Sequence, residues 1–204
     1  MYLIRSYEDF LDYMRFSGKN ASCIIPVVLI RPGTVMRMNE RNGMDDFFDY
    51  FDARTGDITF FLPGYSYTPG TKLSHLFDKI VSGQRRRPAF SIQRLGEVEA
   101  SNQDFVSFIN TLENRCPSYR YYGNTELLLF RYIPGSGYER GEFDFRGLRR
   151  YNLTEVYRRR GRPGLMRFLE TLLHDYRDFS EDFSFSEAAD LLYNDIVQET
   201  NYGE

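Results

Sequence analysis

One carboxylate in the sequence stands where a strand rarely carries a charge. Glu126 leads directly into residues 127–130, an apolar run typical of a buried strand. A buried carboxylate needs a partner, or its pKa rises, and such groups cluster at functional sites. Glu126 is therefore a candidate catalytic residue, and the alternative is a position at a strand edge facing water. His75, beside the apolar positions of a predicted helix, is a second candidate as a general base, and its alternative is a surface position.

Two loops rich in proline and glycine follow predicted strands and form the candidate ligand site. Ligands of open α/β sheets bind at the carboxyl ends of strands, where helix N-termini present N–H groups to anions. Arginine pairs with phosphate there, and tyrosine stacks on bases. We therefore expect a concave pocket whose ligand is anionic and aromatic, with a nucleotide as the first choice. Its predicted border consists of Arg31, Thr34, Tyr65, Tyr67 and Thr71.

Arginine is preferred over lysine, 23 to 3, and is concentrated late in the chain. Residues 146–168 carry eight arginines and one acid, Glu155, a local charge of +7, whereas residues 171–204 carry nine acids and one arginine, a local charge of −8. Opposite charges in two segments predict a contact between them, within one chain or between two. The candidate interface or nucleic-acid residues are Arg146, Arg149, Arg150, Arg158, Arg159, Arg160 and Arg162.

These patterns support three functions. Arginine is enriched and lysine depleted at protein interfaces, so the leading expectation is a binding or regulatory domain that contacts a protein partner or its own copies. The alternative is a nucleotide sensor or nucleotide-directed enzyme that uses the strand-end loops. The third is nucleic-acid binding through residues 146–162, where tyrosines are interleaved with arginines. A net charge of −3 and a pI of about 5.6 count against the third. The residues leave open whether the protein is an enzyme.

Several familiar chemistries are missing from the sequence. Two histidines and two dispersed cysteines exclude zinc sites of the usual His/Cys spacing. The motifs of phosphate loops, dinucleotide folds, serine hydrolases and zinc proteases do not occur. We therefore expect neither a metal nor a cofactor. No apolar stretch approaches the ~20 residues that cross a bilayer and no signal peptide is visible, so we expect no membrane partner and a reducing, cytoplasmic location.

Helices and strands alternate along the chain. Continuous apolar runs predict buried strands at 23–30, 58–62 and 125–133, and weaker patterns predict strands at 89–95, 119–122 and 142–145. Pro26 lies inside the first strand and favours a sheet edge or a bulge there, because proline lacks a ladder donor. Helical spacing of apolar residues marks helices between these strands and in the C-terminal part.

This alternation predicts the fold class. We expect a three-layer α/β sandwich with a mostly parallel sheet, antiparallel edge strands near 119–145 and a C-terminal helical pair. A chain of 204 residues is expected to form a single domain spanning 1–204. Glycines and a proline at 161–164 precede the helical portion, 162–204, which we expect to pack on the same domain.

Overall fold

The computed structural model describes residues 2–16, 22–32, 60–67, 98–136, 139, 141–178 and 187–198. Their main element is a five-stranded sheet in the order β1-β3-β2-β6-β7. Its strands are β1 (Tyr2–Ile4), β3 (Phe61–Pro63), β2 (Cys23–Leu29), β6 (Glu126–Ile133) and β7 (Glu142–Asn152). β1, β3 and β2 are parallel, β6 is antiparallel to β2, and β7 is antiparallel to β6, so four of the five strands point the same way. The predicted mostly parallel sheet with antiparallel pairing toward one edge is confirmed.

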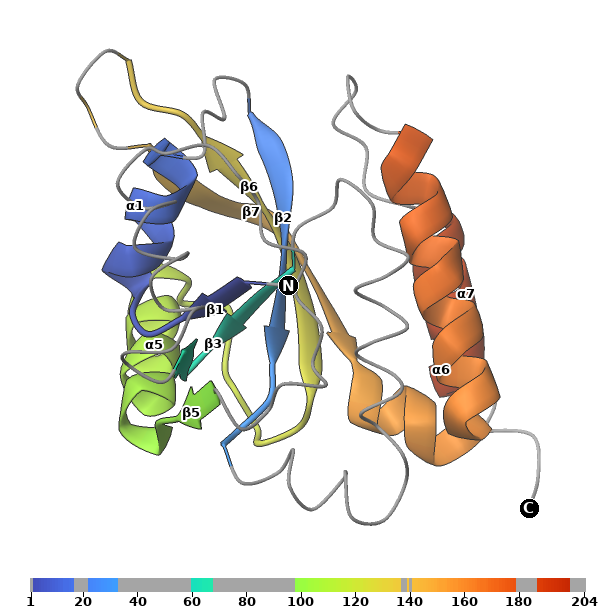
Figure 1. Ribbon diagram of the computed structural model, residues 1–204. Coiled ribbons are helices and arrows are strands. Elements are labelled where there is room, and N and C mark those ends of the chain that lie inside the picture. Colours follow the sequence, from blue (N-terminus) through green and yellow to red (C-terminus); the bar gives the residue numbers. More distant parts are fainter. Residues whose placement is uncertain are drawn as a thin grey trace.

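Helices lie on both sides of the sheet (Figure 1). One side carries α1 (Tyr7–Phe16) and α5 (Asn102–Arg115), and the other carries α6 (Leu153–Asp178) and α7 (Glu187–Gln198), which form the predicted C-terminal helical pair. Alternate residues of the inner strands join two hydrophobic clusters. In β6, Leu128 and Phe130 pack toward α1 and α5, whereas Leu127 and Leu129 pack toward α6 and α7. Burial on both faces is the reason why these strands are continuously apolar.

A tight turn at Gly64 links the sheet to α5. The turn joins β3 to β4 (Tyr65–Tyr67), which pairs with β5 (Val98–Ala100). Gly64 has a φ of 80°, and a β-carbon there would lie 2.6 Å from Cβ of Phe105, so only glycine fits without strain. The carbonyl of Gly64 accepts a hydrogen bond from the backbone N–H of Ser101, the residue whose side chain caps α5. The first turn of α5 is thereby held beside the end of β3.

An irregularity in β7 decides which arginines face which side of the sheet. Between the pairs Arg131–Asp144 and Leu129–Arg149, β7 advances five residues while β6 advances two. Gly147, with a φ of 79°, lies in this bulge. Because the three extra residues are an odd number, the alternation of side chains reverses across the bulge. Beyond it, Arg150 shares the face of α1 and α5.

α6 contains the glycine-rich boundary that the sequence analysis placed at 161–164. Gly161 has a φ of 63° and a ψ of −166°, and Pro163 follows it, so the helix is kinked there. The helix continues beyond the kink, where Leu169 and Leu172 are buried. Among the described residues, no helix combines the length and the hydrophobicity that a membrane crossing requires.

Other expectations differ from the structure. Residues 119–122 form a loop and no strand. β4 lies in the proline- and glycine-rich loop expected after the strand at 58–62. β1, at the start of the chain, was not expected as a strand. Pro26 lies in an inner strand and pairs with Leu129 in continuous register, so the expectation of an edge or a bulge was wrong. Among the described residues, β3 is registered with β2 only at Phe61, opposite Val27, so one missing donor disturbs little of this part of the ladder. The predicted strand at 89–95 lies outside the described residues.

Candidate functional site

The carboxyl ends of β2 and β3 lie at the same edge of the sheet, the lower edge in Figure 1. The two strands are parallel neighbours, with Val27 opposite Phe61. Arg31 therefore leaves β2, and Gly64 leaves β3, on the same side of the molecule. β6 begins at this edge with Glu126, which is paired with Leu29 at the end of β2. This is the position at which open α/β sheets place their ligands.

Arg31 is an exposed guanidinium at this edge. Its Nε donates a hydrogen bond to Oδ1 of Asn102, the first residue of α5, at 3.3 Å. Within the part of the chain that the structure describes, no carboxylate lies within ion-pair distance of Arg31, and its two terminal nitrogens make no hydrogen bond. Asn102 thus orients the guanidinium while leaving its terminal nitrogens free to bind an anion.

Tyr121 lies close to Arg31 and comes from the loop that follows α5. Its backbone N–H donates to Oε1 of Glu113 at 2.8 Å, and its ring packs edge-on against Phe105, with 5.5 Å between the centroids. The hydroxyl is buried and has no hydrogen-bond partner among the described residues. Burial raises the pKa of Tyr121 to about 12, assisted by the negative charge of Glu126 and opposed by the charge of Arg31. The hydroxyl of Tyr121 is therefore neutral and has no hydrogen-bond partner among the described residues.

Glu126 is fully buried, so the alternative of a water-facing strand edge was wrong. Its Oε2 accepts hydrogen bonds from the Tyr119 hydroxyl at 2.8 Å and from Nε of Arg150 at 3.0 Å. Its Oε1 accepts a further hydrogen bond from Nη2 of Arg150. Glu126 and Arg150 are diagonal neighbours on one face, because Asn152 is paired with Glu126 and Arg150 with Leu128.

This ion pair changes the proton affinities around it. Burial raises the pKa of Tyr119 above its usual range, and the charge and hydrogen bond of Glu126 raise it further. Burial alone would lower the pKa of Arg150, but the hydrogen bonds and the charge of Glu126 raise it overall. Both oxygens of Glu126 are occupied and closed off from solvent. This geometry fits a residue that positions its neighbours better than a free general base.

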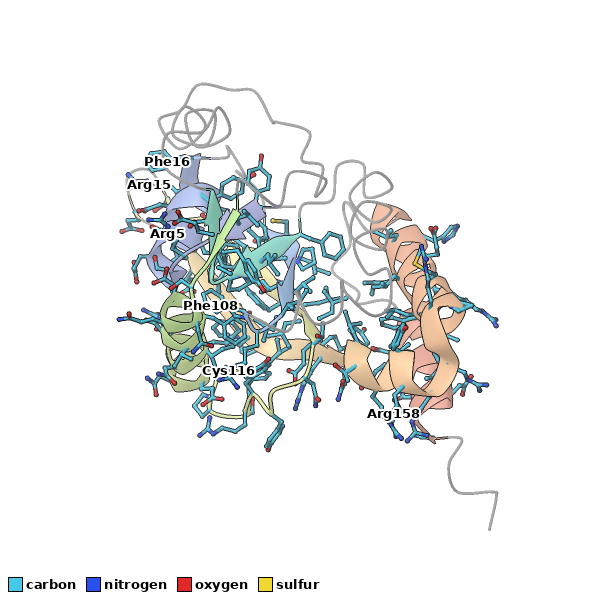
Figure 2. All side chains as sticks on the ribbon, turned by 60° about the horizontal axis from the view of Figure 1, so that its bottom comes forward. Arg5, Arg15, Phe16, Phe108, Cys116 and Arg158 are labelled. Carbon is cyan, nitrogen blue, oxygen red and sulfur yellow. The ribbon has the colours of Figure 1, made fainter. Side chains whose placement is uncertain are left out.

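The loop from Tyr119 to Tyr122 carries these contacts. It leaves α5 at Cys116, labelled in Figure 2, whose carbonyl accepts a hydrogen bond from the N–H of Tyr119 at 2.9 Å. Arg120 donates to the carbonyl of Tyr119 at 2.7 Å. Together with the contact between Glu113 and Tyr121, these hydrogen bonds hold the loop against α5. The sequence analysis missed Asn102 and the three tyrosines of this loop as site residues. Three tyrosines within four positions, with an arginine among them, are the signal that could have marked the segment.

The predicted border of the pocket is described only in part. Tyr65 is buried, and its hydroxyl donates to the carbonyl of Ile30 at 3.2 Å. The ring of Tyr65 therefore belongs to the core and offers no face for stacking, contrary to our expectation. Thr34, Thr71 and the catalytic candidate His75 lie outside the described residues, as does the side chain of Tyr67. The concave pocket stays a prediction.

The seven arginines of the candidate interface do not share one face. Arg150 pairs with Glu126 on the side of α1 and α5, whereas Arg149 forms an ion pair with Asp190 of α7, at 3.2 Å, on the other side. The contact between Arg149 and Asp190 joins the basic and the acidic segments within one chain. Further ion pairs link Arg146 with Asp144, and both Arg158 and Arg159 with Glu155. Arg160 and Arg162 are exposed on α6, as is Arg158, which lies on the outside of that helix in Figure 2.

The described residues contain no group of three or more histidines, cysteines or carboxylates placed to hold a metal ion. Comparison with protein-family models, with curated proteins and with solved structures found no match for this chain.

Proposed function

We propose that this chain is a binding domain for an anionic small molecule, held where β2 and β3 end. The observation that carries the proposal is the exposed guanidinium of Arg31, oriented by Asn102 and without a carboxylate partner among the described residues. A phosphate or carboxylate group would accept a pair of hydrogen bonds from this guanidinium. The unpartnered hydroxyl of Tyr121, close to Arg31, would donate another. The ligand would thus satisfy a buried polar group that the described residues leave unsatisfied.

Calorimetric titration with pyrophosphate tests this proposal. The wild-type protein should bind pyrophosphate. Arg31→Gln should weaken binding by about 10- to 100-fold, because a hydrogen bond to a charged group contributes about 1.5–3 kcal/mol. Arg15→Gln is the matched control, since Arg15 is an equally exposed arginine at the far end of α1. Equal affinities in all three proteins would rule out Arg31 as the anion partner.

Tyr121→Phe separates binding from folding. Because the Tyr121 hydroxyl is buried without a partner among the described residues, its removal should leave the free energy of unfolding unchanged or raise it. Pyrophosphate binding should become weaker in the same variant. A loss of stability on this substitution would mean that the hydroxyl has a partner within the protein, and its role in binding would then lose its basis.

A second candidate function is contact with a protein partner or a second copy of the chain. Its support is Leu191, which is 64 % exposed on the outer face of α7, with the exposed acids Glu187 and Asp195 on either side. α6 lies beside α7, and several of the exposed residues of α6 are arginines. Sedimentation at increasing salt tests self-association, because screening weakens contacts between exposed charges. A monomer at every protein and salt concentration would exclude contact between copies.

Nucleic-acid binding through residues 146–162 has less support. Five of its seven arginines are engaged with carboxylates of the same chain, and they lie on different sides of the sheet. Binding of a polynucleotide that weakens steeply with salt, and that is lost in Arg160→Gln/Arg162→Gln, would revive this function.

Two further expectations accompany the proposal. A three-layer sandwich is supported by the two hydrophobic clusters, which use alternate residues of the same strands. A cytoplasmic location is supported by the two cysteines, Cys23 and Cys116, neither of which forms a disulfide.

A further inference from the structure

The aromatic ring of Tyr122 is exposed to solvent and is held in place by a neighbouring side chain. Among the tyrosines whose side chains the structure describes, it alone is exposed, at 73 %. The guanidinium of Arg150 lies over its ring, with 5.2 Å to the centroid. Hydrogen bonds to Glu126 fix Arg150, and Arg150 in turn holds the ring of Tyr122 in position. Most of the Tyr122 side chain is open to solvent in spite of this contact.

The backbone of this segment is also held in place. Glu113 accepts the N–H of Tyr121, the residue directly before Tyr122, and Arg120 donates to the carbonyl of Tyr119. An aromatic side chain on an anchored loop loses little conformational entropy when a flat group stacks on it. Such a ring provides a ready stacking surface for a planar ligand.

Tyr122 and Arg31 both lie near Glu126, at the edge of the sheet where β2 ends. Glu126 is paired with Leu29, two residues before Arg31, and the guanidinium of Arg150, which is bound to Glu126, lies over the ring of Tyr122. An exposed aromatic ring and a guanidinium whose terminal nitrogens make no hydrogen bond to the described residues thus occur together at one edge of the sheet. A planar ring joined to an anionic group is the chemistry that matches this pair.

We infer that the ligand of this site carries a nucleobase, stacked on Tyr122, together with a phosphate bound by Arg31. The inference rests on the proposed anion site and names the class of its ligand. Two sources supply this chemistry, a free nucleotide and a single-stranded nucleic acid. Stacking of a base on an aromatic side chain serves both, because every base has a π-face.

The test compares AMP, ribose 5-phosphate and a short oligothymidylate on the wild-type protein and on Tyr122→Ala, Tyr122→Phe and Arg31→Gln. AMP should bind more tightly than ribose 5-phosphate, which has the phosphate but no base. Tyr122→Ala should weaken AMP by about 5- to 150-fold and leave ribose 5-phosphate unchanged, as expected for the loss of one stacked base. Tyr122→Phe should retain the affinity for AMP, because the ring is kept. Since Tyr122 is exposed, these variants should unfold at the temperature of the wild-type protein.

The outcomes separate this inference from the proposed function. An oligothymidylate that binds more tightly than AMP, with the same dependence on Tyr122, would identify a single strand as the source; the reverse order would identify a nucleotide. Equal binding of AMP and ribose 5-phosphate, weakened by Arg31→Gln but not by Tyr122→Ala, would overturn the stacked base and retain the anion site. Absence of binding by all three probes, or binding that ignores Arg31, would overturn both.

Discussion

Removal of the Arg150 guanidinium should expose the energetic cost of a buried charge. In Arg150→Met, Glu126 would keep one hydrogen bond, from the Tyr119 hydroxyl, and lose its two bonds from the guanidinium. Methionine retains the length and flexibility of the stem, so the change is mainly one of charge. Glu126 is fully buried, so its carboxylate would be left with the Tyr119 hydroxyl as the one side-chain donor that remains of the three described.

The magnitude follows from the burial of the two partners. Loss of one member of a buried ion pair costs about 3–5 kcal/mol, because the remaining charge is left uncompensated. The side chain of Arg150 is 32 % exposed, which gives solvent some access to the pair. We therefore expect a loss near the lower end, about 3 kcal/mol. The triple variant Tyr119→Phe/Glu126→Met/Arg150→Met has no charge or hydroxyl left to satisfy, and it should unfold within about 1 kcal/mol of the wild-type protein.

Equilibrium unfolding in urea at constant m-value measures these differences. Arg146→Met is the matched control, since Arg146 also pairs with a carboxylate, Asp144, but its side chain is 88 % exposed. It should change the midpoint little or not at all. The reasoning fails if Arg150→Met is as stable as the control, or if the triple variant is no more stable than Arg150→Met alone.

Three shorter predictions concern α6 and its contacts. Leu169→Ala and Leu172→Ala should each lower the free energy of unfolding in urea by about 2–5 kcal/mol, since both side chains are buried against α7 and the sheet; losses below about 0.5 kcal/mol would mean that α6 is not docked. Tyr151→Phe removes a hydroxyl that donates to Oδ1 of Asp190 at 2.6 Å, so amide exchange in α7 should accelerate, and unchanged exchange would contradict a role in holding that helix. Hydrogen bonds from two neighbouring arginines lower the pKa of Glu155 from 4.5 to about 2, so its contribution to stability is present above pH 4.5 and is lost as the pH falls toward 2. The stability difference between the wild-type protein and Glu155→Gln should therefore shrink over that range, whereas a constant difference would speak against the lowered pKa.

The sequence predicted best the strands that are buried on both faces. In β2 and β6 every position from Val27 to Leu29 and from Leu127 to Phe130 is apolar and buried, so no alternative placement competes with a central strand. Burial of Glu126 with a partner was one of two readings of the same pattern. The sequence did not identify the partner of Glu126, because Arg150 lies 24 residues later in the chain, in a different strand.

Side-chain alternation in β7 separates two neighbouring arginines of the candidate interface. Arg149 and Arg150 are adjacent in sequence and look like parts of one basic patch. In the structure they lie on opposite faces of the sheet, one bound to Asp190 and the other to Glu126. Any strand would place two adjacent side chains on opposite faces, and the bulge at Gly147 decides which arginine faces α7 and which faces Glu126. A regular strand without the bulge would reverse the two.

The tyrosine loop shows how a local rule can fail at a candidate site. Aromatic residues favour strands, and a strand would have placed Tyr119 and Tyr121 on one face and Tyr122 on the other. Hydrogen bonds to α5 outweigh this preference. The carboxylate of Glu113 accepts the backbone N–H of Tyr121, and the carbonyl of Cys116, at the end of α5, accepts the backbone N–H of Tyr119. The three side chains consequently enter three surroundings. One donates to Glu126, one ends in a buried hydroxyl near Arg31, and one lies open over Arg150. A regular strand would not have provided three such different groups within four residues: a hydroxyl that anchors the ion pair, a donor without a partner among the described residues and an exposed ring. The proposed binding surface depends on this departure from the expected structure.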